Sequence, residues 1–93
     1  MIGAPNGNAA PMVDRVREYV MAAADARETH ANRVSVGDWS GALAAVDRER
    51  RHLEAAAAML DDSAELSAII GDRAGARAYR ARAASVRAWA AVL

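Results

Sequence analysis

The chain of 93 residues contains no cysteine, no lysine and no phenylalanine. Without cysteine it can form neither disulfide bonds nor thiolate metal sites. It also lacks an apolar run near the ~18 to 20 residues of a membrane span, and its N-terminus has neither the basic start nor the apolar segment of a signal peptide. We therefore expect a cytoplasmic protein. A virion location, if the gene is a phage gene, and secretion without a cleaved signal stay open.

Aromatic residues are scarce, with only Tyr19, Trp39, Tyr79 and Trp89, whereas alanine occurs 26 times. A chain this short buries only about 60 to 65% of the surface of its unfolded form. We therefore expect close alanine-lined helix contacts, with a partner or a second copy completing the burial. All twelve cations are arginine, a composition typical of a high-GC bacterium or its phage.

The hydrophobic periodicity predicts an all-α protein. Apolar residues recur every three or four positions, as in the segment Met12, Val16, Tyr19, Ala23, Ala26, His30 and Val34. We expect an antiparallel helical hairpin or bundle of three or four helices, forming a single domain over 12–93. The expected helices cover about 12–36, 39–60, 64–70 and 73–93. Residues 1–11, rich in turn formers, are expected to form a flexible arm.

Two Gly-Asp pairs separate these segments: Gly37-Asp38 and Gly71-Asp72. Glycine tolerates the left-handed conformation that ends a helix, and aspartate accepts hydrogen bonds from the free N–H groups that open the next one. Each pair is therefore predicted to be a two-residue joint between helices.

The middle of the chain is open to two interpretations. Helix propensity falls at Asp61-Asp62-Ser63, and Asp62 with Glu65 has the form of a capping box, which favours a break. The alternative is one helix from Trp39 to Ile70. Glu49 interrupts the apolar stripe of this helix, so we expect a charged ring around it. The stripe consists of Trp39, Ala42, Val46, Leu53, Ala56 and Leu60.

The first joint recurs 34 residues later. Aligning 37–59 with 71–93 gives eight identities in 23 positions, among them Gly41 and Ala42 with their counterparts. The spacing and the Gly-Asp-x-x-x-Ala start resemble the second helix of a tetratricopeptide repeat, with Ala42 and Ala76 at its small position. The resemblance implies a degenerate helix-pair module that binds proteins. The alternative is that Gly-Asp is simply an efficient helix joint used twice.

The same residues carry a second resemblance. Trp39-Ser40-Gly41 between two helices is similar to the turn motif of the WXG100 (ESAT-6-like) proteins. That resemblance implies a dimeric helical hairpin exported by type VII secretion. The family's tail signal, an acid four residues after a tyrosine, is not matched, because Ala83 follows Tyr79.

No residue pattern points to catalysis, to a cofactor or to a metal. Glu49 and His52 have the E-x-x-H spacing of a di-iron ligand pair, but the second such pair is missing. There is no Ser-His-acid constellation and no glycine-rich phosphate loop. We therefore expect a protein that is not an enzyme.

Charge is divided unevenly along the chain. Residues 1–72 hold seven arginines and all twelve acids (net −5), whereas 73–93 hold five arginines and no acidic side chain (net +5). Four of those arginines follow the helical repeat on one face: Arg73, Arg77, Arg80 and Arg87. We expect them to meet carboxylates of the same assembly, although a nucleic-acid backbone is an alternative partner.

The sequence thus predicts a small non-enzymatic module for protein–protein interaction or assembly, itself oligomeric or part of a larger structure. Its candidate contact residues are the four arginines with Trp39 and Trp89. The alternatives are a WXG100-like secreted hairpin and a nucleic-acid-binding accessory protein.

Overall fold

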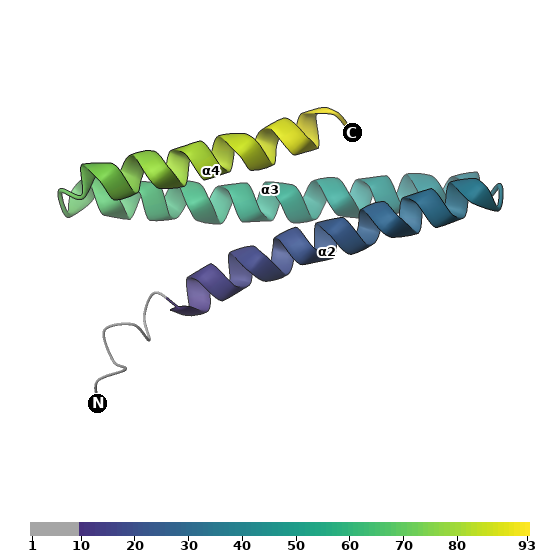
Figure 1. Cartoon of the computed structure of the whole chain (residues 1–93), viewed down its shortest axis with the longest axis horizontal. Coiled ribbons are helices and arrows are strands. Elements are labelled where there is room, and N and C mark those ends of the chain that lie inside the picture. Colours follow the sequence, from purple (N-terminus) through teal and green to yellow (C-terminus); the bar gives the residue numbers. More distant parts are fainter. Residues whose placement is uncertain (1–9) are drawn as a thin grey trace.

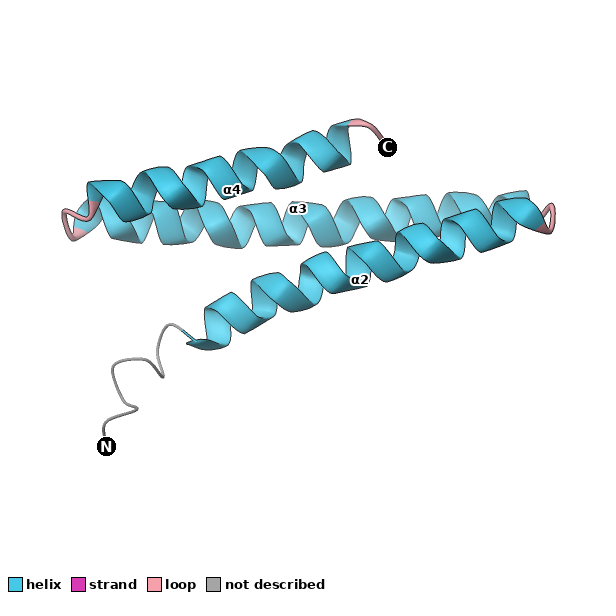
Figure 2. Ribbon diagram, in the orientation of Figure 1, coloured by secondary structure: helices cyan, strands magenta, loops and turns pink. Residues whose placement is uncertain are grey.

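A computed structural model describes residues 10–93, with side chains from Asp14 onward. It contains three α-helices, α2 (Ala10–Ser35), α3 (Trp39–Ile69) and α4 (Arg73–Ala91), joined by short loops (Figures 1 and 2). The helices are antiparallel, and α2 and α4 each pack on α3. The predicted all-α fold is confirmed, with three helices. Of the predicted flexible arm, residues 1–9 lie outside the described part of the chain, while Ala10 and Pro11 belong to α2.

The two joints have the same hydrogen-bonding geometry. Gly37 and Gly71 have φ of 75° and 85°, in the left-handed region that favours glycine. The N–H groups of Gly37 and Asp38 donate to the carbonyls of Val34 and Arg33, the pattern of a Schellman motif. The N–H groups of Gly71 and Asp72 donate to Ala68 and Ser67 in the same way. The repeat in sequence is therefore a repeat in structure.

The aspartate of each joint serves both helices. Its backbone N–H closes the preceding helix, and its side chain caps the next one, accepting from Gly41 N at 3.0 Å in the first joint and from Gly75 N at 2.9 Å in the second. A Cβ at Gly41 would lie 2.8 Å from Asp38 Cγ, and one at Gly75 would lie 2.7 Å from Asp72 Cγ. The third identical position of the repeat, glycine in both copies, thus leaves room for the capping carboxylate.

The predicted break at residues 61–63 is wrong, because α3 is a single helix of 31 residues. Ser63 and Ala64 are buried, and Ser63 Oγ donates to the carbonyl of Met59 one turn earlier. Packing of this segment against the neighbouring helices outweighs its low intrinsic propensity and its capping-box pattern. The separate helix predicted over 64–70 is the last part of α3.

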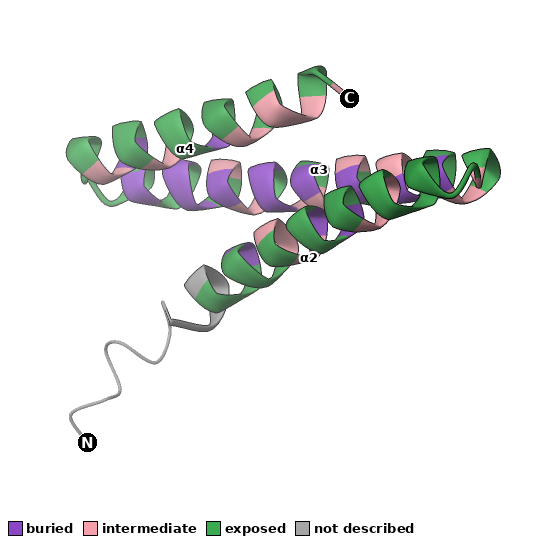
Figure 3. Ribbon diagram, turned by 45° about the vertical axis from the view of Figure 1, so that its right-hand side comes forward, coloured by how far each residue is buried: buried purple, intermediate pink, exposed green. Residues whose placement is uncertain are grey.

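The core lies along one face of α3, which is the helix with the most buried positions (Figure 3). Its centre consists of Val16, Ala56, Leu60 and Ala83, one or two residues from each helix. Half-buried side chains pack around this centre: Tyr19, Val20, Met59, Tyr79 and Val86. Alanine at the crossing points allows the helices to approach closely, so the few large side chains can complete a small core.

The molecule is elongated and thin, measuring 51 × 29 × 13 Å along its principal axes. Its radius of gyration is 16.0 Å, whereas a compact chain of this length would have about 12 Å. In the view of Figure 1, α3 lies between α2 and α4, and both pack along its one buried face. A large share of each helix therefore faces solvent.

Candidate functional site

The E-x-x-H pair of α3 does not form a metal site. Glu49 is buried and bonded to Trp89, whereas His52 packs beside the ring of Tyr19, with centroids 6.2 Å apart. Across the described residues, no three His, Asp or Glu side chains gather where they could hold a metal ion. The two side chains serve separate helix contacts.

Glu49 is the main polar group of the interior. It is 1% exposed, and one of its carboxylate oxygens accepts a hydrogen bond from Trp89 Nε1 at 2.5 Å. Glu49 thus lies on the buried face of α3, where it interrupts the apolar stripe. A buried carboxylate requires a donor, and the indole of α4 supplies it. This bond joins residues 40 positions apart and holds the end of α4 against α3.

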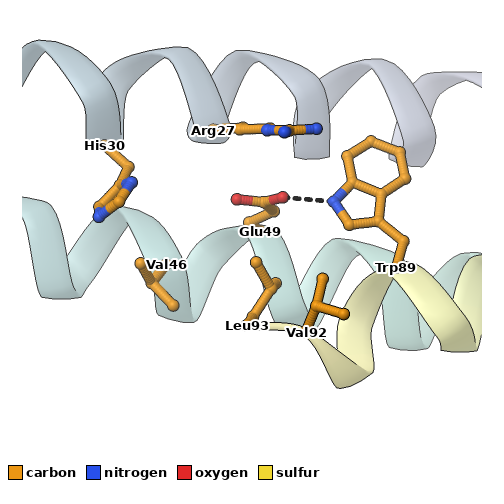
Figure 4. Close-up of a pocket in the computed structure, with 7 residues that line it drawn as sticks. All are labelled: Arg27, His30, Val46, Glu49, Trp89, Val92 and Leu93. Atoms are coloured by element: carbon orange, nitrogen blue, oxygen red, sulfur yellow. Dashed lines mark hydrogen bonds between the residues drawn. The ribbon is translucent and has the colours of Figure 1, made fainter.

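A hollow of about 440 Å³ surrounds this bond. Figure 4 shows Arg27 and His30 entering it from α2, opposite Glu49 of α3 and Trp89 of α4. Val46, Val92 and Leu93 form its apolar side. All three helices meet here, so the hollow lies at the point where the shorter α4 ends along α3.

The arginines predicted to form one stripe divide into two groups. Arg73, Arg77 and Arg80 line a hollow of about 460 Å³ together with Ala68 and Ala76. Arg87 instead forms an ion pair with Asp61 of α3. The hydrogen bond from Arg87 lowers the pKa of Asp61 below its ordinary value of 3.8, and the charges of Arg87 and Arg80 act in the same direction. The same contact raises the pKa of Arg87.

The two candidate tryptophans differ in environment. Trp89 is partly buried against α3, whereas Trp39 is 65% exposed at the start of that helix. The sequence pattern placed Trp39 on the apolar stripe of α3, but the residue lies in the first turn, where it remains largely exposed to solvent. In the described chain it is free to contact another molecule.

Sequence reasoning did not single out the other exposed apolar side chains. From Asp14 onward, seven of the nine exposed large apolar side chains, with Trp39 among them, lie beside the two joints: Val34, Val36, Trp39, Leu43, Leu66, Ile69 and Ile70. The signal was present, since Leu43, Leu66 and Ile69 fall outside the apolar stripe predicted for α3. We call these two groups the joint clusters, one over 34–43 and one over 66–70.

The described helices include none with the length and apolar character needed to cross a lipid bilayer. Comparisons with protein-family models, with curated proteins and with solved structures found no match to this chain.

Proposed function

We propose that this chain is a non-enzymatic helical module for protein–protein interaction, which self-associates as a structural part of an assembly in a high-GC bacterium or its phage. The observation that supports this proposal is the position of the joint clusters. They expose large apolar side chains at both ends of α3, on a molecule only 13 Å thick. We place the protein in the cytoplasm, or in the virion if the gene belongs to a phage.

Exposure of the apolar side chains of the joint clusters to water is unfavourable in free energy. Trp39 and Leu43 are one helical turn apart and are 65% and 71% exposed, and Leu66, Ile69 and Ile70 are 64%, 73% and 78% exposed. Burying one such side chain stabilises a complex by about 1.5 to 3 kcal/mol. Large apolar side chains that gather on an exposed surface often mark a site of protein–protein contact. A partner that covers the clusters would recover this free energy.

A second candidate is a WXG100-like secreted hairpin. The position of Trp39-Ser40-Gly41 favours it, because the motif opens α3 directly after the joint with α2 and its tryptophan is exposed. The third helix, α4, has no counterpart in a two-helix hairpin. We therefore rank this candidate below a cytoplasmic assembly module.

Sedimentation velocity over a range of concentrations tests the proposed function. We expect the wild-type chain to associate, and the Trp39→Ser/Leu43→Ser variant to associate at least tenfold more weakly. Val92→Ser is the matched control, because Val92 is 82% exposed but lies away from both joints. Equal association of all three proteins would contradict a role for the first joint cluster.

A further inference from the structure

The solvent face of α2 carries a stripe of acids. Asp14, Glu18, Asp25 and Glu28 are all exposed and recur at intervals of four, seven and three residues, which keeps them on one side of a helix. Asp14 precedes the buried Ala23 by nine residues, or two and a half turns, so the stripe points away from the core. We call these four residues the acidic stripe.

The opposite outer helix, α4, carries the complementary charge. Arg73, Arg77 and Arg80 are exposed and recur at intervals of four and three residues, and they line one hollow with no acid among its other lining residues. We call these three residues the basic stripe. The two stripes have similar helical spacing and opposite charge.

No member of either stripe forms an ion pair within the described part of the chain, although the charge of Arg80 acts on Asp61. The ion pairs found there join Arg33 to Asp38, Arg51 to Asp47 and Arg87 to Asp61, and none includes a member of either stripe. The stripes lie on α2 and α4, which lie on either side of α3 in the view of Figure 1 and make no close backbone contact with each other. One copy therefore does not bring them together.

We propose that a second copy of this chain docks the acidic stripe of its α2 on the basic stripe of α4. This inference rests on the proposed self-association and names its surface. Each copy carries both stripes, so two copies can make the contact reciprocally, or many copies can make it in series. Met21 lies within the acidic stripe and is 60% exposed, and the docked helix would cover it.

The charge distribution of the chain favours a second copy over a nucleic acid as the partner of the basic stripe. The chain has a formal net charge of zero, and the acids of α2 and α3 would repel a phosphate backbone. A second copy instead offers carboxylates at a matching spacing. Association through the stripes should weaken with salt, because the screening length falls from about 10 Å at 0.1 M to about 3 Å at 1 M.

Charge reversal of each stripe tests the proposal. Arg77→Glu/Arg80→Glu reverses the basic stripe, and Asp25→Arg/Glu28→Arg reverses the acidic stripe. The matched controls, Arg48→Glu/Arg82→Glu and Asp62→Arg/Glu65→Arg, make the same changes in net charge at exposed positions outside the stripes. Helix content of every variant is checked by circular dichroism, and association is measured by sedimentation velocity.

We expect each stripe variant alone to associate at least tenfold more weakly than wild type, while an equimolar mixture of the two stripe variants associates again. The mixture of the two control variants should behave as wild type.

If both stripe variants associate as strongly as wild type, the docking of one stripe on the other is contradicted, whereas the proposed function still holds. A wild-type chain that never associates would overturn both. Binding of a DNA duplex at 0.15 M salt that only the basic-stripe variant loses, with self-association unchanged, would assign the arginines to nucleic acid.

Discussion

At the scale of single residues, replacing Gly41 or Gly75 by alanine should not give the gain in stability that this replacement gives at an ordinary helix position. Replacing glycine by alanine inside a helix usually stabilises it by about 0.5 to 1 kcal/mol. Here the new Cβ would displace the capping carboxylate of Asp38 or Asp72, and losing such a cap costs about 0.5 to 2 kcal/mol. We therefore expect Gly41→Ala and Gly75→Ala to be neutral or destabilising in urea unfolding.

The physical cause of this expectation can be isolated in a double-mutant cycle. In the Asp38→Ala background the cap is already absent, so Gly41→Ala should stabilise the protein by the usual about 0.5 to 1 kcal/mol. If Gly41→Ala also stabilises the wild-type protein, the Asp38 carboxylate can cap the helix without a glycine at position 41.

A second prediction at this scale concerns the hydrogen bond between Glu49 and Trp89. Trp89→Phe keeps an aromatic ring but leaves a buried carboxylate oxygen without its donor. Hydrogen bonds to charged groups contribute about 1.5 to 3 kcal/mol, so we expect a loss of this size in the free energy of unfolding. Trp39→Phe is the control, since Trp39 is exposed and its replacement should change stability by less than about 0.5 kcal/mol. Similar small effects of both substitutions would contradict the role of the bond.

At the scale of helices, the ion pair between Arg87 and Asp61 gives α4 and α3 a pH-dependent contact. The pair lowers the pKa of Asp61 in the folded protein below 3.8, so its contribution is present above that pH and is lost as pH falls through the lowered pKa. We expect Arg87→Gln to raise the pKa of Asp61 toward 3.8 in an NMR titration. The difference in melting temperature between this variant and wild type should shrink below pH 3.8. A difference that persists at lower pH would mean that Arg87 acts through packing alone.

The helices also show which features can be predicted from a sequence. The joints depend on local chemistry, because Gly37 supplies the left-handed residue and Asp38 supplies the cap, and both are visible in the chain. The continuity of α3 through Ser63 depends on burial against other helices, which local propensity does not contain. The partner of Glu49 lies 40 residues away, so its burial followed from the tertiary arrangement and not from its neighbours in sequence.

At the scale of the whole molecule, the packing of α2 and α4 on one face of α3 explains why so little of the chain is buried. Only one face of α3 is covered by both neighbours, and the large apolar side chains beside the joints remain in water. The sequence indicated a small core through its alanine content and its few aromatics. The positions of Leu66 and Ile69 outside the apolar stripe of α3 indicated part of the uncovered surface, but that stripe also included Trp39, which is exposed.

The central claim is that one copy of this chain is incomplete and that copies associate. Multi-angle light scattering of the purified protein, measured from low to high concentration, tests this claim most directly. The monomer has a mass of 9.8 kDa, and we expect a mass of at least twice that value at high concentration, falling toward the monomer on dilution. A mass of 9.8 kDa at every concentration would contradict self-association.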